Sequence, residues 1–202
     1  AHATVHPQQC AIQMPTEHWT YGELLSAVQR VATFLWSRKW PEKWPGKLVA
    51  GDLIGDLISE SSFDEPFPEE GKQGQWRVGI LLPNRIDGLA VFLGVALAGD
   101  VAIVLNPDWP MAQLREVLHQ CTPDLLVVDG DRMQGLEHSG DTLAAILGKI
   151  VDVGDLVSGR LWSGRSPDQY SQDHSQAPFP PNVPDTTPFY IGFTSGTTGC
   201  PR

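Results

Sequence analysis

Apolar residues recur along this chain at two spacings, one typical of a helix and one typical of buried strands. The segment from Thr20 to Glu23 has the pattern of a capping box, and leucines and valines follow it at helical spacing until Trp40-Pro41. Further on, four short runs are rich in valine, leucine and isoleucine, and helix-like segments separate them. The predicted strands are Val78–Leu82, Val101–Leu105, Leu125–Asp129 and Lys149–Val153, and the predicted helices between them are Asp87–Ala98, Met111–Gln120 and Asp141–Leu147.

The regular alternation of these strands and helices predicts the fold class. The four strands begin roughly 24 residues apart, and their near-continuous apolar character is typical of a parallel sheet that is covered on both faces. Right-handed crossovers between such strands give a doubly wound open sheet. We therefore expect an α/β fold with a doubly wound, mostly parallel sheet flanked by helices, to which the run Pro188–Phe193 adds one more short strand.

Two stretches interrupt this pattern and indicate how the chain is organised. Residues 41–75 are rich in glycine, proline and acidic residues, so we expect an inserted surface loop there, with one possible short helix at Asp52–Ser61 and an acidic insert over about residues 51–75. The Pro- and Ser-rich composition of residues 158–188 predicts an irregular excursion. We expect one domain, in which the α/β core spans residues 1–157 and a strand with its following loop spans 189–202.

Composition and charge exclude several classes of protein. The net charge of −10 argues against an electrostatic nucleic-acid binder, which needs a basic face. The longest apolar run, Gly88–Gly99, is too short to span a bilayer, and no signal peptide is visible. Three cysteines, Cys10, Cys121 and Cys200, lie far apart and predict a reducing, cytoplasmic location. The histidines show no zinc-ligand spacing, so we expect no zinc site.

The last residues of the chain carry the chemistry. The stretch from Thr194 to Gly199 places four hydroxyl side chains and two glycines directly after a predicted strand. Hydroxyl groups and exposed backbone N–H groups can bind several oxygens of a polyphosphate, and glycines let the backbone approach them. Arg202 adds a planar guanidinium that suits phosphate oxygens. The spacing fits neither a Walker A loop nor a GxSxG nucleophile elbow, and an ordinary flexible loop or linker stays open on these residues alone.

The string from Tyr190 to Arg202, YIGFTSGTTGCPR, resembles the phosphate-loop signature of the adenylate-forming superfamily. That superfamily includes acyl- and aryl-CoA synthetases, peptide-synthetase adenylation domains and luciferases. Every fixed position matches except the last, where arginine stands and lysine is usual. Three upstream stretches resemble other motifs of the family in the correct order, namely His18–Leu24, Gly79–Asn84 and Gly99–Pro107. The resemblance therefore covers nearly the whole chain, apart from the acidic insert and the Pro-rich excursion.

This resemblance implies an enzyme that activates a small-molecule carboxylic acid with ATP and Mg²⁺ and then transfers the acyl group to a thiol, with CoA as the expected co-substrate. The magnesium ligand and other catalytic groups are expected downstream, so the chain is interpreted as an N-terminal fragment that is inactive alone. A homodimer, a carrier-protein-loading adenylation domain and, less favoured, a non-catalytic nucleotide- or anion-binding module stay open. The expected phosphate-binding residues are Thr194, Ser195, Gly196, Thr197, Thr198, Gly199 and Arg202.

Overall fold

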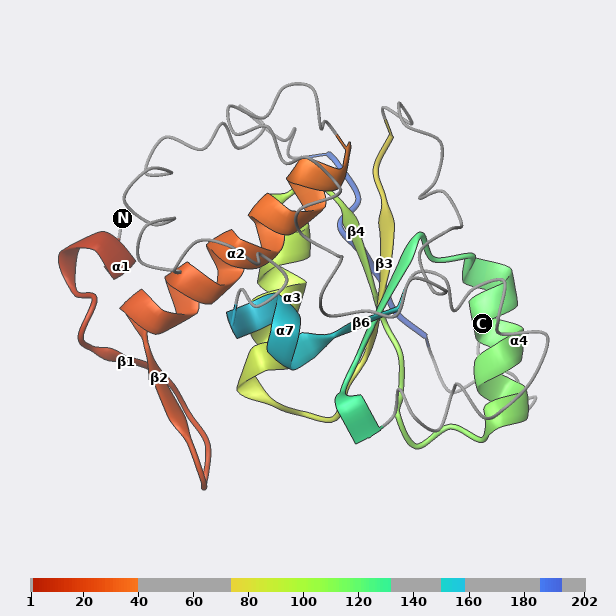
Figure 1. The fold of residues 1–202 in the computed structure, drawn as a ribbon, viewed down its shortest axis with the longest axis horizontal. Helices are drawn as coiled ribbons and strands as arrows, with labels where there is room; N and C mark the ends of the chain where they lie inside the picture. Colours follow the sequence, from red (N-terminus) through yellow and green to blue (C-terminus); the bar gives the residue numbers. More distant parts are fainter. Residues whose placement is uncertain (1, 40–73, 132–149, 159–185, 194–202) are drawn as a thin grey trace, which may run out of the picture.

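A computed structural model of the chain describes residues 2–39, 74–131, 150–158 and 186–193 (Figure 1). The predicted helices at Asp52–Ser61 and Asp141–Leu147 lie outside these residues, as does the predicted phosphate loop from Thr194 to Arg202. The described part contains a central sheet, the helices that cover it and the strand that leads to that loop. None of its helices is long and apolar enough to cross a membrane.

A five-stranded sheet forms the centre of the described structure, and all of its strands are parallel. The strand order is β6-β5-β3-β4-β7, so the first strand of this sheet lies in its middle. Each predicted strand is present, although the last is shorter than expected. The strands are β3 (Arg77–Leu81), β4 (Val101–Val104), β5 (Leu125–Val128), β6 (Ile150–Asp152) and β7 (Tyr190–Ile191). The prediction of an α/β fold with a mostly parallel sheet is confirmed.

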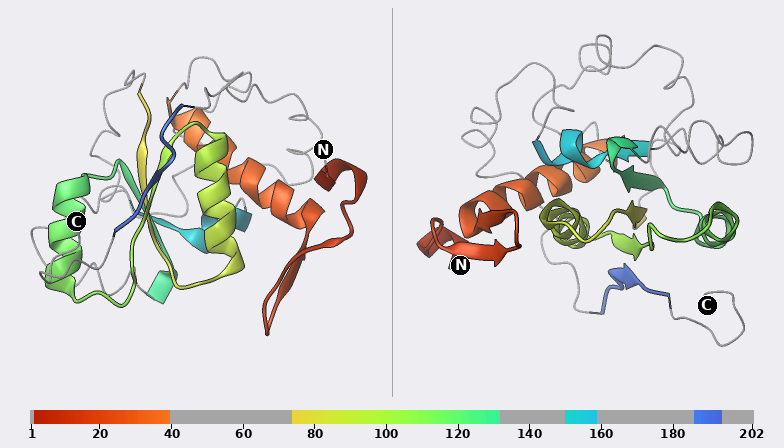
Figure 2. Two further views of the ribbon diagram at one scale, coloured as in Figure 1. Left: turned by 180° about the vertical axis from the view of Figure 1, so that it is seen from behind. Right: turned by 90° about the horizontal axis from the view of Figure 1, so that it is seen from below.

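Helices cover both faces of this sheet, as Figures 1 and 2 show. On the first face lie α2 (Tyr21–Lys39), α3 (Ile86–Leu97) and α7 (Val153–Ser158), and on the second lies α4 (Met111–Cys121). The predicted doubly wound arrangement is therefore confirmed. The sequence pattern did not predict α7 or the N-terminal elements, which are α1 (His2–Val5) and an antiparallel pair of β1 (Cys10–Gln13) and β2 (His18–Thr20).

Successive residues of each strand pack on opposite faces, so the sheet separates two cores. In β3, Val78 and Ile80 pack with the helices of the first face, whereas Leu81 packs with α4. In β5, Leu125 packs with the helices of the first face and Leu126 packs with α4. Both faces of these strands are buried, which explains why the strands appear in the sequence as continuous apolar runs.

The predicted capping box is confirmed at the start of α2. The Thr20 N–H donates to Glu23 Oε2 at 2.7 Å, and the Glu23 N–H donates to Thr20 Oγ1 at 3.2 Å. The Thr20 hydroxyl also donates to Glu23 Oε2 at 2.9 Å. The hydrogen bonds that the Glu23 carboxylate accepts lower its pKa because they stabilise its charged form. The bond from the Thr20 N–H has the larger effect, and the bond from the Thr20 hydroxyl has the next largest.

Helices α2 and α3 meet at a glycine. A Cβ atom at Gly94 would lie 2.5 Å from the Val31 Cβ and 3.0 Å from the carbonyl oxygen of Val28. Val31 is fully buried, and its β-branched side chain has little freedom to move aside. The absence of a side chain at Gly94 therefore lets the two helices approach this closely.

Two aspartates fix the amino end of the central strand. Asp100, which directly precedes β4, accepts a hydrogen bond from the Trp76 N–H at 2.9 Å. Asp124, which directly precedes β5, accepts one from the Arg77 N–H at 2.8 Å. Asp100 is fully buried, and a buried backbone N–H needs such a partner. The strands on either side of β3 thus each supply a carboxylate that anchors its first residues.

Candidate functional site

The carboxyl ends of the five parallel strands meet at one edge of the sheet, where ligands bind in open α/β sheets. From β3 the chain passes through α3 on the first face to β4, and from β4 through α4 on the second face to β5. The connection after β3 therefore crosses the first face of the sheet, and the connection after β4 crosses the second face. Where the connections of two neighbouring strands go to opposite faces, a crevice is expected between the carboxyl ends of those strands, here β3 and β4. Strand β7 pairs with β4 and ends at the same edge. The predicted loop thus leaves the sheet one strand away from this crevice.

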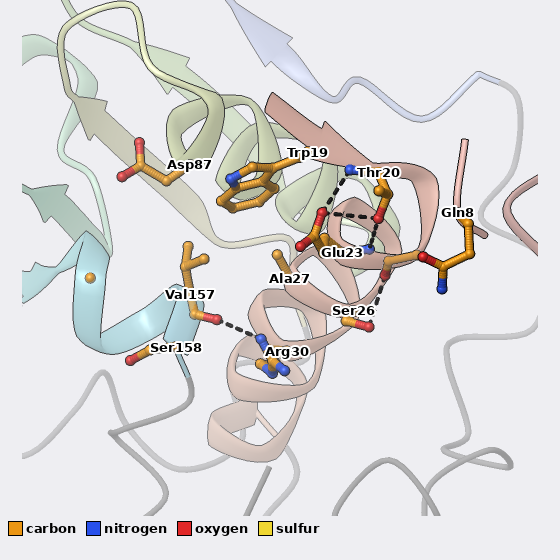
Figure 3. A pocket seen from close by; sticks show the side chains of 12 residues that line it. Gln8, Trp19, Thr20, Glu23, Ser26, Ala27, Arg30, Asp87, Val157 and Ser158 are labelled. Atoms are coloured by element: carbon orange, nitrogen blue, oxygen red, sulfur yellow. Dashed lines mark hydrogen bonds between the residues drawn. The ribbon is translucent and has the colours of Figure 1, made fainter. Parts of the chain in front are cut away.

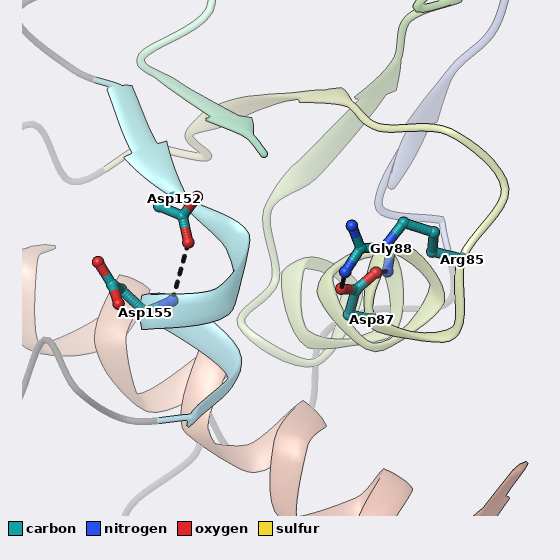
Figure 4. A network of polar contacts seen from close by, with 5 residues as sticks. All are labelled: Arg85, Asp87, Gly88, Asp152 and Asp155. Carbon is teal, nitrogen blue, oxygen red and sulfur yellow. Dashed lines mark hydrogen bonds and ion pairs between the residues drawn. The ribbon is translucent and has the colours of Figure 1, made fainter. Parts of the chain in front are cut away.

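Short polar contacts fix the beginnings of two helices at this edge (Figure 4). Arg85 Nη2 lies 2.6 Å from Asp87 Oδ2, and Asp87 Oδ1 accepts a hydrogen bond from the Gly88 N–H at 2.8 Å in the first turn of α3. At the start of α7, the Asp155 N–H donates to Asp152 Oδ1 at 3.2 Å. A carboxylate in the first turn of a helix also interacts favourably with the helix dipole. These carboxylates therefore have a structural role in holding the loops around the edge.

The charged residues that the structure describes at this edge are mostly acidic. In the segments 82–88, 105–110, 129–131, 152–155 and 192–193 the one lysine or arginine is Arg85, which is paired with Asp87. The aspartates of these segments are Asp87, Asp108, Asp129, Asp131, Asp152 and Asp155. A polyphosphate at this edge would meet charges of its own sign, so its binding depends on additional donors or cations. The predicted loop, with its hydroxyl groups and Arg202, can supply such donors.

Strand β7 is held on both faces just before that loop begins. The Tyr190 ring meets Phe92 of α3 edge to face, with 5.8 Å between ring centroids, whereas Ile191 packs against the core under α4. Phe193, the last residue described, meets Trp109 edge to face at 5.5 Å. Trp109 belongs to the loop that follows β4. These contacts fix the direction in which the chain leaves the sheet.

The loop after β4 is itself held by a short turn. Asn106 Oδ1 accepts a hydrogen bond from the Asp108 N–H at 2.9 Å, and the Asn106 carbonyl accepts one from the Trp109 N–H at 3.3 Å. Helix α4 begins at Met111 directly after this turn. The sequence pattern did not reveal the contact between Trp109 and Phe193, because it depends on β7 lying beside β4. An aromatic residue just beyond each of these two strands is the one signal that the sequence offers.

All the predicted phosphate-binding residues, Thr194 to Gly199 and Arg202, lie outside the described residues, and their assignment stays a prediction. Among the residues that the structure describes, no group of three or more His, Cys, Asp or Glu is arranged to hold a metal ion. Burial raises the pKa of the Cys121 thiol, which keeps it protonated and makes it a poor nucleophile.

A pocket of about 690 Å³ lies on the helical side of the first face, between α2 and α7 (Figure 3). Several of its polar side chains bond within the protein. Ser26 donates to the Gly22 carbonyl at 2.9 Å, Arg30 donates to the Val157 carbonyl at 3.0 Å, and Glu23 belongs to the capping box. None of its lining residues comes from β7 or from the loop after β4. The pocket is therefore separate from the residues that lead to the predicted loop.

Comparison with known proteins finds a matching family and curated relatives. Residues 69–202 match the family model of AMP-binding enzymes. An uncharacterized acyl--CoA ligase, YhfT of Bacillus subtilis (strain 168), is 35% identical over 126 residues, which are 62% of this chain and 22% of that protein. The nonribosomal peptide synthetase inpB of Emericella nidulans is 26% identical over 128 residues, which are 62% of this chain and 5% of that protein. The chain thus spans less than a quarter of the length of these curated relatives.

A solved structure shares this fold. The N-terminal domain of FACL13 from Mycobacterium tuberculosis, in an inhibitor-bound crystal structure, superposes with a TM-score of 0.62 at 20% identity. The superposition covers 98% of this chain and 40% of that one, and at this identity it shows the fold alone. The family model spans β3 to β7 together with the predicted loop. The chain therefore belongs to the AMP-binding enzyme family of the adenylate-forming superfamily.

Proposed function

We propose that the chain is the N-terminal part of an ATP-dependent carboxylic acid–CoA ligase. The observation that carries this proposal is the position of β7, whose carboxyl end lies at the carboxyl edge of a doubly wound sheet just before the segment Thr194–Arg202 begins. The 35% identity to a protein described as an acyl-CoA ligase supports a ligase of this kind.

The proposed reaction has two steps. A carboxylate oxygen of the acid attacks the α-phosphorus of ATP, and the bond from that phosphorus to the bridging oxygen breaks, which releases pyrophosphate and leaves an acyl-adenylate. A thiol sulfur, that of CoA, then attacks the acyl carbonyl and AMP departs. Negative charge grows on the pyrophosphate as it leaves, so donors placed around its oxygens accelerate the first step.

The loop would supply these donors. Its hydroxyl groups and backbone N–H groups bind the β- and γ-phosphates, and the guanidinium of Arg202 offers a fixed charge. The hydroxyl donors are Thr194, Ser195, Thr197 and Thr198, and the positions of close backbone approach are Gly196 and Gly199. The charged side chains described at this edge are mostly acidic, so the loop would offset part of the repulsion that the phosphates meet there.

A second candidate function is an adenylation domain that loads a carrier protein. The match to the nonribosomal peptide synthetase inpB favours it. A CoA ligase and such an adenylation domain would share the first step, the formation of the acyl-adenylate, and differ in the thiol that accepts the acyl group. A non-catalytic nucleotide- or anion-binding module is the third, and it would use the loop without any reaction.

Pyrophosphate exchange separates the two enzymes from the non-catalytic module, and a product assay separates the two enzymes from each other. We expect the full-length gene product to exchange labelled pyrophosphate into ATP with at least one member of a panel of carboxylic acids, and the 202-residue chain to show none. Product formation with CoA, compared with a carrier protein bearing phosphopantetheine, then identifies the acceptor. If the full-length gene product binds ATP but shows no exchange with any acid of the panel, the non-catalytic binding module is supported. If the 202-residue chain alone catalyses exchange, the proposal that this chain is catalytically incomplete is refuted.

Two loop variants test the role of Arg202 in the full-length protein. Arg202→Ala is expected to slow exchange by about tenfold to a hundredfold, the range of a lost charge-assisted hydrogen bond. Arg202→Lys should retain most of the rate, because the charge remains. Thr186→Ala, at an exposed hydroxyl before β7, is the matched control and should leave exchange unchanged. Equal rates for Arg202→Ala and the control would remove this residue from the site.

A further inference from the structure

The pocket between α2 and α7 has opposite charges at its two ends, and we call it the α2–α7 pocket. Glu23, Ala27 and Arg30 line it from α2, and their spacing of four and then three residues places them on one side of the helix. The helix rises by about 10 Å over the seven residues from Glu23 to Arg30, and Figure 3 shows Glu23 and Trp19 at one end of the pocket and Arg30 at the other. With a volume of about 690 Å³, the pocket has room for a small molecule that carries a charge at each end.

The first end offers a carboxylate beside an aromatic ring. Both bonds that Thr20 donates to Glu23 go to Oε2, and within the described residues Glu23 Oε1 accepts no hydrogen bond. The partly buried Trp19 lines the same end, whereas the nearby Asp87 carboxylate is already paired with Arg85. A carboxylate oxygen binds a protonated amine through a charge-assisted hydrogen bond, and an indole ring attracts the same charge. This end therefore suits an ammonium group.

The second end offers a guanidinium group that is held in place. Arg30 Nη1 donates to the Val157 carbonyl at 3.0 Å, which fixes the group against α7. Among the described residues, Nε and Nη2 of Arg30 have no hydrogen-bond partner. A guanidinium with donors to spare binds a carboxylate well, and one that is already held loses little freedom on binding. This end therefore suits a carboxylate group.

The middle of the pocket is apolar. Ala27 is 2% exposed, and Val157 and Trp19 pack around the cluster to which it belongs. Contact with these side chains would remove the surface of an aliphatic chain from water, which is favourable. A polar linker would leave hydrogen-bonding groups without partners there, which is costly. The two charged groups of the ligand are therefore joined by a hydrocarbon chain.

We propose that the α2–α7 pocket binds a linear ω-amino carboxylic acid, with its ammonium group at Glu23 and Trp19 and its carboxylate at Arg30. A simple fatty acid fits less well, because its methyl end would meet the Glu23 carboxylate. An alkylamine has the same defect at Arg30. Since no lining residue comes from β7 or from the loop after β4, this site is separate from the predicted phosphate loop, and the proposal does not rest on the ligase reaction.

Three ligands of equal chain length test the two ends of the pocket. We would titrate the full-length gene product with 8-aminooctanoate, octanoate and octylamine in a calorimeter. The amino acid should bind at least about tenfold more tightly than either of the others, because it alone uses both charged groups of the pocket. No measurable binding of 8-aminooctanoate, or equal binding of 8-aminooctanoate and octanoate, would overturn the proposal.

Two variants assign each end to its residue. In Arg30→Ala, 8-aminooctanoate should bind no better than octylamine, and in Glu23→Gln it should bind no better than octanoate. Gln29→Ala, at an exposed neighbour that does not line the pocket, is the control and should bind like the wild type.

Binding at the acid site of the ligase would give a different result, since it would persist in both variants, and that outcome would overturn the proposal. Arg30→Ala also removes the bond to the Val157 carbonyl, so its folding is checked by circular dichroism. If it does not fold, Glu23→Gln decides by the same comparison of 8-aminooctanoate with octanoate.

Discussion

Two glycines on α3 provide a test of the packing of this fold, because alanine at each of them should act in opposite directions. Gly94 faces α2, where a Cβ atom would lie 2.5 Å from the Val31 Cβ and 2.6 Å from its Cγ1. Gly88 lies six residues earlier on the same helix, and a Cβ atom there would meet Leu82 at 3.6 Å, an ordinary van der Waals distance. Both substitutions make the same chemical change in one helix, so the difference between them reports the helix contact.

The magnitude follows from two opposing effects. Alanine stabilises a helix interior by about 1 kcal/mol relative to glycine, and near the helix start at Gly88 we expect about half of that. At Gly94 the added methyl group overlaps a buried, β-branched side chain and lies 3.0 Å from the backbone oxygen of Val28. Overpacking of this kind costs about 3 kcal/mol where neither neighbour can move aside. We therefore expect Gly94→Ala to destabilise the chain by about 2 kcal/mol and Gly88→Ala to stabilise it slightly.

Urea denaturation of the three proteins measures this difference. With an unchanged m-value, the midpoint of Gly94→Ala should fall, and its melting temperature should drop by about 4–8 °C, the shift that 2 kcal/mol gives in a chain of this size. Val31→Ala combined with Gly94→Ala should not restore stability, since the Val31 Cβ and the Val28 oxygen both remain. A Gly94→Ala protein as stable as Gly88→Ala would show that α2 and α3 do not approach closely at this point, and the account of their packing would be wrong.

Three further predictions concern polar and aromatic contacts. Asp100→Ala should destabilise the chain by about 1–3 kcal/mol, since it leaves the buried Trp76 N–H without its acceptor, and urea midpoints should show Asp100→Asn losing less. The wild type should be more stable than Glu23→Gln above pH 4.5, and this advantage should vanish as acidification passes the lowered pKa of Glu23; an advantage independent of pH would contradict the assignment. In the full-length enzyme, Trp109→Ala should raise the KM for ATP by about three- to tenfold in pyrophosphate exchange, whereas Trp109→Phe, which keeps an aromatic partner for Phe193, should retain the wild-type value.

The strands and the start of α2 could be predicted because their signals are local. The middle strands are buried on both faces, so nearly every position is apolar and the run itself indicates the strand. The capping box involves only Thr20, Glu23 and the backbone between them. Neither feature depends on which elements meet in the folded chain.

The strand order and several short elements could not be predicted, because they depend on packing between distant segments. Nothing in the run Val101–Leu105 indicates that β3 will lie on one side of it and β7 on the other. Helix α7 begins at Val153, directly after β6 ends at Asp152, and its six residues are too few to show a helical period. The role of Asp100 has the same cause, since its partner Trp76 lies 24 residues away.

At the candidate site, one feature has a local signal in the sequence and another depends on contacts between distant segments. The string that begins at Tyr190 could be identified as the lead-in of a phosphate loop, yet the position of that loop depends on contacts that the string does not contain. Strand β7 has only two residue pairs in register with β4, which is too little to orient it. Its orientation therefore depends on side chains: Tyr190 packs against α3 on the first face, and Phe193 packs against Trp109 on the second. Even Gly192 takes part, because a Cβ atom there would lie 2.5 Å from the Tyr190 hydroxyl oxygen and push the ring out of its place. The residues before the loop are thus anchors on both faces of the sheet, and the chemistry proposed for Thr194 to Arg202 depends on them for its geometry.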